Sequence, residues 1–369
     1  MTLTDEQRIA WLRLIRSENV GAVTFRELIN HFGSAAAALD TLPTLARRGG
    51  KAIRVCSRDD AERELAAVAA IGARIVTSGD PDYPPWLRFA PGAPPLVTVR
   101  GNGACLARPT IAVVGSRNAS IAGRKFAMQI AAGLGEAGFT VASGLARGID
   151  AAAHAAALAT GTVAVFAGGL DRPYPPENVA LGREIVERGG AHMTEMPMGW
   201  EPRARDFPRR NRVISGISVG VVVIEAAFRS GSLITARLAA EQGRLVFAVP
   251  GSPLDPRTGG TNQLIKDGAN MVTSVDDIVA EIEPMLAKRQ APKPSGSIDD
   301  SADETGAMSD AGPSDRDRIV SALGAAPTEL DEIIRFTGLT PAQVRLVIIE
   351  LAVAGRLEHH PGGRVSLIG

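Results

Sequence analysis

The stretch Thr110-Ile111-Ala112-Val113-Val114-Gly115-Ser116-Arg117 decides the fold class of this chain. An unbroken apolar run is typical of a strand buried on both faces, and a glycine directly after it is typical of a tight turn into a helix. Similar runs recur with room for a helix between most of them, at Phe139–Ala142, Val163–Ala167, Ala191–Thr194, Val219–Ile224, Leu245–Val249 and Met271–Thr273. Buried strands that alternate with helices predict a doubly wound, mostly parallel α/β sheet.

Two shorter strand-like pieces, Arg74–Thr77 and Leu96–Arg100, lie upstream of this stretch on either side of a Pro-rich loop. They extend the predicted Rossmann-like domain to residues 73–286. Aromatic residues make up only 4% of the chain, while Gly and Ala are abundant. This composition favours tight strand-to-helix turns and close helix–sheet packing.

A small all-α module is predicted over residues 1–55. Thr4 and Gln7 have the spacing of a capping box, in which each side chain bonds the backbone of the other residue at a helix start. Two further short helical patterns follow, and Gly21 and Gly33 separate the three.

The C-terminal part is predicted to contain a linker and a second small domain. Residues 287–314 are rich in Asp, Ser, Gly and Pro and contain no aromatic residue, which is typical of a flexible linker. Residues 315–369 contain three helical patterns, the first two at about Arg316–Leu323 and Thr328–Arg335. Leu357–His360 and Arg364–Ile368 follow on either side of a Pro-Gly-Gly turn. Three helices and a hairpin predict a winged-helix fold.

The third of these helices, Pro341 to Ala354, is unusually apolar. Leu346 and Ile349 lie outside its expected core face, and Arg345 and Glu350 are its charged residues. Helices that read DNA usually carry several basic or amide side chains, so we expect this one to have a protein-contact or dimerisation role.

Global charge does not indicate a polyanionic partner, because Lys+Arg and Asp+Glu both total 40. Any electrostatic signal must therefore be local. Cys56 and Cys105 lack metal or disulfide spacing and are expected to be free thiols in a reducing compartment. The N-terminus lacks a signal-peptide pattern, and no apolar run is long enough for a membrane span. We expect a cytoplasmic protein with no metal and no cofactor.

The loops after the strands carry the candidate functional residues, because ligands of open parallel sheets bind outside the carboxyl ends of the strands. Glycines let backbone N–H groups approach an oxyanion, and helix N-termini favour negative charge. The candidates for phosphate binding are Gly115, Ser116, Arg117, Arg124, Ser143, Gly144, Arg147, Gly148, Arg209, Arg210, Asn211, Arg212, Ser230, Gly231, Ser232 and Lys266.

Several known sites are excluded by their motifs. The loop after the first strand lacks GxGxxG, and the chain contains neither the P-loop pattern GxxxxGK[ST] nor the nucleophile elbow GxSxG. The residues after the fourth strand include an arginine cluster, which consists of Arg203, Arg205, Arg209, Arg210 and Arg212. This cluster could also be a solvated face with salt bridges to Glu201 and Asp206. We favour a ligand-binding cluster, because arginines outnumber the acids nearby.

Two carboxylates could perform catalysis. Glu225, at the end of a buried strand, could be a general base for cleavage of a glycosidic bond, or a structural partner of Arg210 or Arg212. Asp150 and His154 are one helical turn apart and could form an acid–base pair, or a helix-start carboxylate near a neutral histidine. We prefer the structural interpretation for both.

The ordered strings of this domain closely resemble the DNA-processing protein A (DprA/Smf) family over roughly residues 74–275. They are Val113–Arg117, Ser143–Asp150 with His154, Pro208–Gly216, Ser230–Ala236, Ala248–Gly251 and Gly260–Ile265. The resemblance extends to the flanking segments, since the N-terminal helices resemble a helix-hairpin-helix or sterile-alpha-motif-like module with Val20-Gly21-Ala22 as the hairpin.

The resemblance implies a dimeric protein without catalytic activity. It implies single-stranded DNA binding, protection of incoming DNA during natural transformation, and loading of the RecA recombinase. Gly115, Ser116 and Arg117 match the family's phosphate-binding loop. Many relatives carry an aromatic residue after this loop, where this chain has Ser120–Gly123, so we expect no base stacking there.

Two rival functions use the same loops. One is a nucleotide-cleaving enzyme such as a phosphoribohydrolase, and the other is a sugar-phosphate sensor with a winged-helix output. The density of arginines and the flanking helical modules favour DNA, because a ribonucleotide pocket needs neither.

Overall fold

The structure is a computed structural model that describes residues 3–288, 311–360 and 362–368. The chain forms two compact units, one of Glu64–Ser295 and one in which Met1–Arg63 joins Gly296–Gly369. Most of the predicted linker, 287–314, lies outside the described residues; of its two ends, 287–288 close one helix and Pro313 begins the next. The predicted domain boundaries remain predictions.

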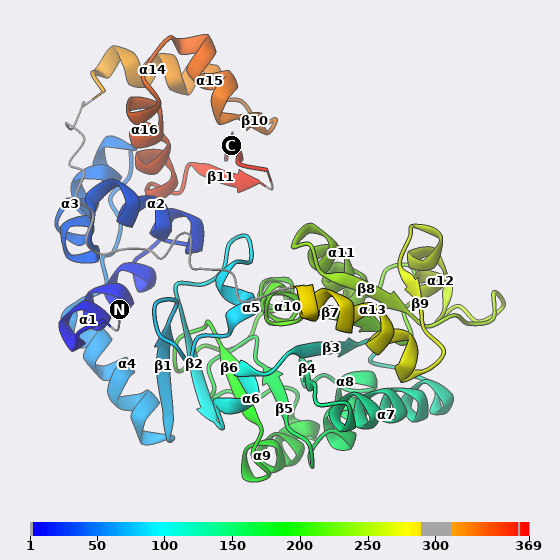
Figure 1. Cartoon of the computed structure of the whole chain (residues 1–369). Helices are drawn as coiled ribbons and strands as arrows, with labels where there is room; N and C mark the ends of the chain where they lie inside the picture. The colour runs from blue at the N-terminus through cyan, green and yellow to red at the C-terminus, as the bar shows by residue number, and fades with distance from the viewer. Residues whose placement is uncertain (1–2, 289–310, 361, 369) are drawn as a thin grey trace. The chain divides into compact units, whose positions relative to one another are not determined.

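A nine-stranded sheet forms the centre of the larger unit (Figure 1). In spatial order its strands are β1 (Ala73–Thr77), β2 (Leu96–Gly101), β6 (Ala191–Thr194), β5 (Thr162–Val165), β4 (Thr140–Ser143), β3 (Thr110–Val114), β7 (Gly220–Val223), β8 (Leu245–Ala248) and β9 (Asn270–Met271). All neighbours from β6 to β9 are parallel, while β2 pairs antiparallel with β1 and β6. The strand order reverses beside β3, which confirms the predicted doubly wound, mostly parallel sheet.

Helices cover both faces of this sheet. The helices are α5 (Pro85–Arg88), α6 (Ala104–Ala107), α7 (Ile121–Glu136), α8 (Ile149–Ala156), α9 (Val179–Glu187), α10 (Asp206–Ile217), α11 (Gly231–Glu241), α12 (Gly259–Lys266) and α13 (Val275–Lys288), with a 3-10 turn at Pro176–Asn178. Alternate residues of a strand point to opposite faces. Ile111 and Val113 therefore pack with α7, α8 and α13, whereas Ala112 and Val114 pack with α10 and α11.

The N-terminal module consists of α1 (Asp5–Arg16), α2 (Ala22–Phe32) and α3 (Ala35–Arg48). The predicted capping box is present: the Gln7 backbone N–H donates to Thr4 Oγ1 at 3.3 Å, and the Thr4 backbone N–H donates to Gln7 Oε1 at 2.9 Å. A fourth helix, α4 (Arg58–Ala70), was not predicted.

The C-terminal part is a winged helix, as predicted. It contains α14 (Pro313–Ala322), β10 (Thr328–Glu329), α15 (Leu330–Thr337), α16 (Pro341–Val353), β11 (Leu357–His360) and β12 (Arg364–Leu367). Its strands form a small sheet in the order β10-β12-β11. The second helix begins later than predicted, because residues 328–329 pair with β12.

Helix α16 is buried on two sides within the smaller unit. Val344 and Leu351 pack in the core of the winged helix, while Leu346, Ile349 and Val353 pack with the residues of α2 and α3. Figure 1 shows α16 beside these two helices. The apolar residues for which we predicted a protein contact are thus covered by the N-terminal helices of the same chain.

Candidate functional site

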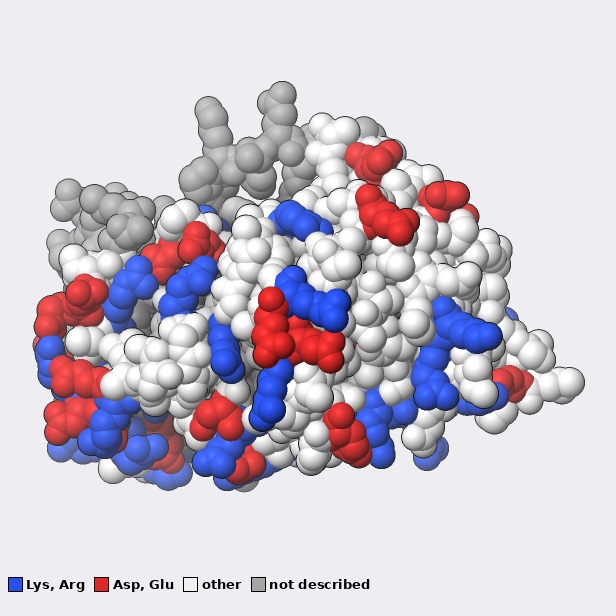
Figure 2. Space-filling view, turned by 90° about the horizontal axis from the view of Figure 1, so that it is seen from below, with Lys and Arg blue, Asp and Glu red and all other residues white. Residues whose placement is uncertain are grey.

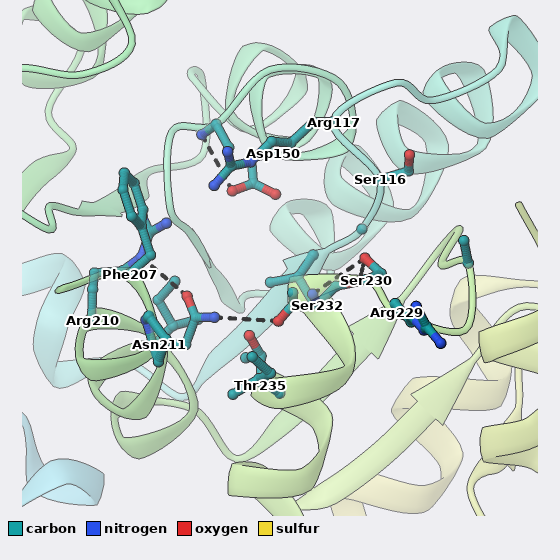
Figure 3. Close-up of a pocket in the computed structure, with 18 of the residues that line it drawn as sticks. Ser116, Arg117, Asp150, Phe207, Arg210, Asn211, Arg229, Ser230, Ser232 and Thr235 are labelled. Carbon is teal, nitrogen blue, oxygen red and sulfur yellow. Dashed lines mark hydrogen bonds between the residues drawn. The ribbon is translucent and has the colours of Figure 1, made fainter. Parts of the chain in front are cut away.

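A pocket of about 500 Å³ opens at the carboxyl ends of β3 and β7, where the strand order reverses. Ligands of doubly wound sheets bind at this position, and the volume suits a small ligand or one segment of a chain. Its walls include Gly115, Ser116, Arg117, Asn118, Asp150, Phe207, Arg210, Asn211, Arg229, Ser230, Gly231, Ser232 and Thr235. In Figure 3, Phe207, Arg210 and Asn211 of α10 lie opposite Arg229, Ser230 and Ser232.

The loop after β3 presents Arg117 to this pocket. The Ser116 backbone N–H donates to the Glu225 carbonyl oxygen at 2.7 Å, which ties the loop to the end of β7. The Arg117 side chain is exposed, and its guanidinium carbon lies 5.2 Å from the centre of the Phe207 ring. Arg117 forms no ion pair with any residue that the structure describes. Its charge is therefore free for an anion.

Part of the loop after β4 is structural. The Ser143 hydroxyl is buried and donates to the Val113 carbonyl oxygen at 2.6 Å. A Cβ atom on Gly144 would lie 2.0 Å from Arg210 Nη1, and one on Gly148 would lie 2.3 Å from the Ser116 carbonyl oxygen. These contacts correct the expectation that Ser143 faces a ligand, and close packing accounts for Gly144 and Gly148, whereas Arg147 of the same loop is exposed.

Arg210 and Asp150 are both buried in the wall of the pocket, where their charges interact. Arg210 Nη1 donates to the Val165 carbonyl oxygen at 2.8 Å and to that of Gly144. Burial lowers the pKa of Arg210 to about 10, and Asp150 opposes this shift. Burial raises the pKa of Asp150, which Arg210 opposes. Arg210 is thus an anchor that adds positive charge to the pocket while its own donors are engaged.

Two further arginines of the cluster, Arg209 and Arg212, are held by Glu195. Arg212 Nη2 lies 2.8 Å from Glu195 Oε2, and Arg209 Nε lies 3.1 Å from Glu195 Oε1. The expected partners have other contacts, since Glu201 pairs with Arg172 and Asp206 accepts from the Trp200 indole. Part of the cluster is therefore paired by its own protein, and neither Arg209 nor Arg212 lines the pocket.

Arg229 and the start of α11 complete the opposite wall. Arg229 is exposed and forms no ion pair with the described residues. Ser230 caps α11, with its hydroxyl accepting from the Ser232 backbone N–H at 3.4 Å. A helix start favours an anion through its partial positive charge. Ser230, Gly231 and Ser232 were predicted from the sequence to bind phosphate. Arg229 and Phe207 were not predicted, although both adjoin predicted residues.

The two candidate catalytic carboxylates, Glu225 and Asp150, both accept hydrogen bonds from backbone N–H groups of this chain. Glu225 accepts from the Ser120 backbone N–H at 2.9 Å and from the Ser120 hydroxyl, so it anchors the start of α7. It does not pair with Arg210 or Arg212, which corrects that expectation. His154 is buried, with Nδ1 2.8 Å from Thr162 Oγ1, and burial lowers its pKa to about 3. It is neutral, as we preferred.

The remaining predicted residues lie outside this pocket. Arg124 on α7 and Lys266 on α12 are exposed, and Arg147 lines a smaller pocket next to Arg117. On the face shown in Figure 2, positive and negative side chains are interspersed. This mixture agrees with the balanced total charge. The local positive charge that could attract an anion is that of Arg117 and Arg229 in the pocket.

Within the described part of the chain, no group of three or more His, Cys, Asp or Glu side chains has a metal-binding arrangement. No single helix among the described residues is long and apolar enough to cross a membrane; α15 and α16 pass that test only as a pair bent by 118°.

Together these features define a class of protein: a Rossmann-like domain with an arginine-bearing pocket at its switch point, a helical module and a winged helix. Family models match all three parts: DNA recombination-mediator protein A over residues 74–283, the DprA-like N-terminal HHH domain over 5–67, and the DprA winged helix domain over 302–363. The chain belongs to the DNA-processing protein A (DprA/Smf) family.

Named relatives agree with this assignment. Protein Smf of Escherichia coli is 41% identical over 228 residues, which are 61% of this chain and 61% of that relative, less than two thirds of its length. DNA processing protein DprA of Streptococcus pneumoniae is 45% identical over 205 residues, covering 55% of this chain and 72% of that protein.

Two solved structures are also similar. The structure of DNA processing protein A from S. pneumoniae superposes with a TM-score of 0.60 at 34% identity, covering 76% of this chain and 99% of that one. That of DNA processing protein A from Helicobacter pylori, described for its single-stranded DNA binding mode, has a TM-score of 0.53 at 25% identity. It covers 58% of this chain and 96% of its own.

Proposed function

We propose that the pocket at the carboxyl edge of the sheet binds the sugar–phosphate backbone of single-stranded DNA. The observation that carries this proposal is the pair Arg117 and Arg229, which line the same pocket without an ion pair to any described residue. The start of α11 lines the same pocket, and its Ser230 and Ser232 add hydroxyl groups. Guanidiniums, hydroxyls and a helix start are the groups that proteins use to hold phosphates.

Such contacts carry no sequence information, so binding should be indifferent to base sequence. Phe207 supplies an aromatic face at the pocket, and stacking on it requires an unpaired base. The combination of backbone contacts with an aromatic ring therefore favours a single strand over a duplex.

The same geometry supports binding without catalysis. Among the residues that line the pocket, Asp150 is the one carboxylate, and its Oδ2 accepts the Gly144 and Ala146 backbone N–H groups at 3.1 and 3.3 Å. Its engagement leaves no free base for cleavage of a nucleotide. Incubation with nucleoside monophosphates should release no free base; release would support the rival nucleotide-cleaving function.

We further propose that the chain acts as a cytoplasmic homodimer that protects incoming DNA and helps load RecA during natural transformation. Family membership supports this part of the proposal. Light scattering measures the dimer, nuclease digestion of bound DNA measures protection, and RecA filament assembly on DNA coated with a single-strand-binding protein measures loading.

Fluorescence anisotropy with labelled single-stranded and duplex oligonucleotides tests the DNA-binding proposal. Arg117→Ala and Arg229→Ala should each weaken single-strand binding, whereas Arg124→Ala, an exposed arginine outside the pocket, should change it little. Equal affinity of the three variants, or a preference for duplex, would contradict the proposed site.

A further inference from the structure

The pocket continues into a second, smaller one on the side away from α11. The smaller pocket has a volume of about 20 Å³ and is lined by Arg117, Gly144, Ala146, Arg147, Tyr174, Pro175, Phe207 and Arg210. Four residues, Arg117, Ala146, Phe207 and Arg210, line both pockets. Because this space is little larger than a water molecule, it cannot enclose a base. The part of a ligand that continues from the larger pocket must therefore lie across the mouth of the smaller pocket.

An aromatic pair forms that mouth. The Tyr174 and Phe207 rings have centroids 5.7 Å apart and meet edge to face at 62°. Arg117 lies over the Phe207 ring at 5.2 Å and Arg210 at 5.8 Å, so Phe207 is held in place by two guanidiniums. Tyr174 is 48% exposed. It is therefore a pre-oriented ring with much of its surface open to solvent.

Within the described part of the chain, four aromatic side chains are prominently exposed: Phe89 at 43%, Tyr174 at 48%, Phe228 at 71% and Phe336 at 73%. Of these four, Tyr174 is the one that lines either of the two pockets. Its ring lies beside the guanidiniums of Arg117 and Arg147 in the smaller pocket. That combination, an open ring next to guanidiniums, is what single-stranded nucleic acids bind, since bases stack on the ring while phosphates meet the cations.

We propose that Tyr174 is a base-stacking platform for the nucleotide that follows the one held in the larger pocket, so that the DNA strand leaves across the Tyr174–Phe207 pair toward Arg147. This inference rests on the proposed single-stranded DNA binding. Arg147 is exposed, and within the described part of the chain it pairs with Glu177 at 3.8 Å, with both side chains 58% exposed. An exposed pair of this kind contributes little, so Arg147 can turn to a phosphate.

The test compares oligo(dT) with an abasic oligonucleotide that has the same number of phosphates, using anisotropy. Tyr174→Ala should bind oligo(dT) about 5- to 150-fold more weakly than the unmodified chain, the range expected for loss of one stacked base. It should bind the abasic strand with nearly unchanged affinity. Tyr174→Phe keeps the ring and should bind both as the unmodified chain does. Phe89→Ala is the matched control and should change neither affinity.

The outcomes separate the two proposals. Unchanged oligo(dT) binding by Tyr174→Ala, with weakened binding by Arg117→Ala, would overturn the platform and leave the phosphate site intact. Equal losses on the two strands would show that Tyr174 only supports the fold, and would also overturn it. If Tyr174→Ala fails to fold, Tyr174→Leu provides an apolar side chain without a π face and carries the same expectation. Absence of oligo(dT) binding by the unmodified chain would contradict the proposed function itself.

Discussion

Arg117 and Arg210 lie over the same Phe207 ring, yet their environments are opposite. Arg117 is exposed without an ion pair to the described residues, while Arg210 is 6% exposed and bonded to backbone carbonyls. Both arginines were predicted from the sequence to bind phosphate, and no local pattern distinguishes them. The difference arises from burial, which places Arg210 among backbone carbonyl groups and near Asp150 inside the protein.

The Glu195 carboxylate provides a prediction at this scale. It is buried and pairs with Arg209 and Arg212. We expect Glu195→Gln to lower the free energy of unfolding by about 3 kcal/mol, the lower end of the range for breaking a buried ion pair, because Arg209 is partly exposed. Urea unfolding measures this. Glu201→Gln, which removes an exposed pair with Arg172, should cost less than about 1 kcal/mol; equal costs would contradict the account.

Sequence patterns predicted which residues lie near the pocket better than which of them are free. Gly115, Ser116 and Arg117 could be placed near the pocket because ligands of open parallel sheets bind beyond the carboxyl ends of the strands. Glu195 could not be identified as a partner, since ion pairs between distant segments leave no local pattern. Tyr174 lies far from Arg117 in the sequence and reaches it only through the fold.

At the scale of elements, the central strands β3, β4, β5, β6 and β7 were predicted correctly because all their residues are buried, which produces mostly apolar runs. Helix α4 was missed because its amphipathic pattern is weak and its large apolar residues are only Leu65 and Val68. The start of α15 was misplaced because Thr328 and Glu329 join a strand pairing that forms with β12, far along the chain.

The start of α11 supplies the prediction at this scale. Ser230 caps α11 at the pocket, and Ser34 caps α3 elsewhere, with each hydroxyl accepting a backbone N–H. Replacement of either serine by alanine should cost about 1 kcal/mol of stability. Only Ser230→Ala should weaken single-stranded DNA binding, by about 2- to 5-fold for loss of one hydrogen bond. Unequal stability costs, or equal effects on binding, would count against the assignment.

At the scale of the whole molecule, the two ends of the chain form one unit, which no local pattern could predict. Asn19 Nδ2 donates to the Val353 carbonyl oxygen at 3.0 Å, and Arg356 Nη1 donates to that of Gly49 at 3.1 Å. The apolar surface of α16 was the one indication in the sequence that the helix has a partner.

Gly49 lies where α3 and α16 approach each other most closely. A Cβ atom there would lie 2.1 Å from the Glu350 carbonyl oxygen, although the backbone conformation of Gly49 itself suits alanine. We therefore expect Gly49→Ala to increase hydrogen exchange in both α3 and α16. Gly21→Ala is the control, because a Cβ atom on Gly21 would have no neighbouring atom within 4 Å. Protection that is unchanged in Gly49→Ala would mean that the two ends of the chain do not pack together in solution.

Glu27 on α2 gives this unit a pH dependence. Burial raises the pKa of Glu27 to about 7, Arg345 opposes this shift, and His359 Nε2 on β11 lies 3.6 Å away. A carboxyl with a raised pKa stabilises the fold below its ordinary value of 4.5 and loses that contribution as pH rises through about 7. Thermal unfolding of Glu27→Gln should match that of the unmodified chain near pH 4.5 and exceed it above pH 7.

His359 contributes in the opposite direction. Burial lowers its pKa, and His360 adds to this shift, so its contribution to stability is lost as pH falls below its ordinary value of 6.5. The contribution of His359 is present in both the unmodified chain and the Glu27→Gln variant. An unfolding temperature of Glu27→Gln that equals the unmodified value at every pH would refute the assignment of the pH dependence to Glu27.

The most direct test of the central claim is the salt dependence of single-stranded DNA binding. If the pocket and its rim neutralise three or four phosphates, the logarithm of the binding constant should fall with the logarithm of salt concentration at a slope of about −2 to −3. Arg117→Ala should weaken binding to all sequences alike and make the slope shallower by about 0.7. A slope that Arg117→Ala leaves unchanged, or a loss that depends on base sequence, would contradict the account.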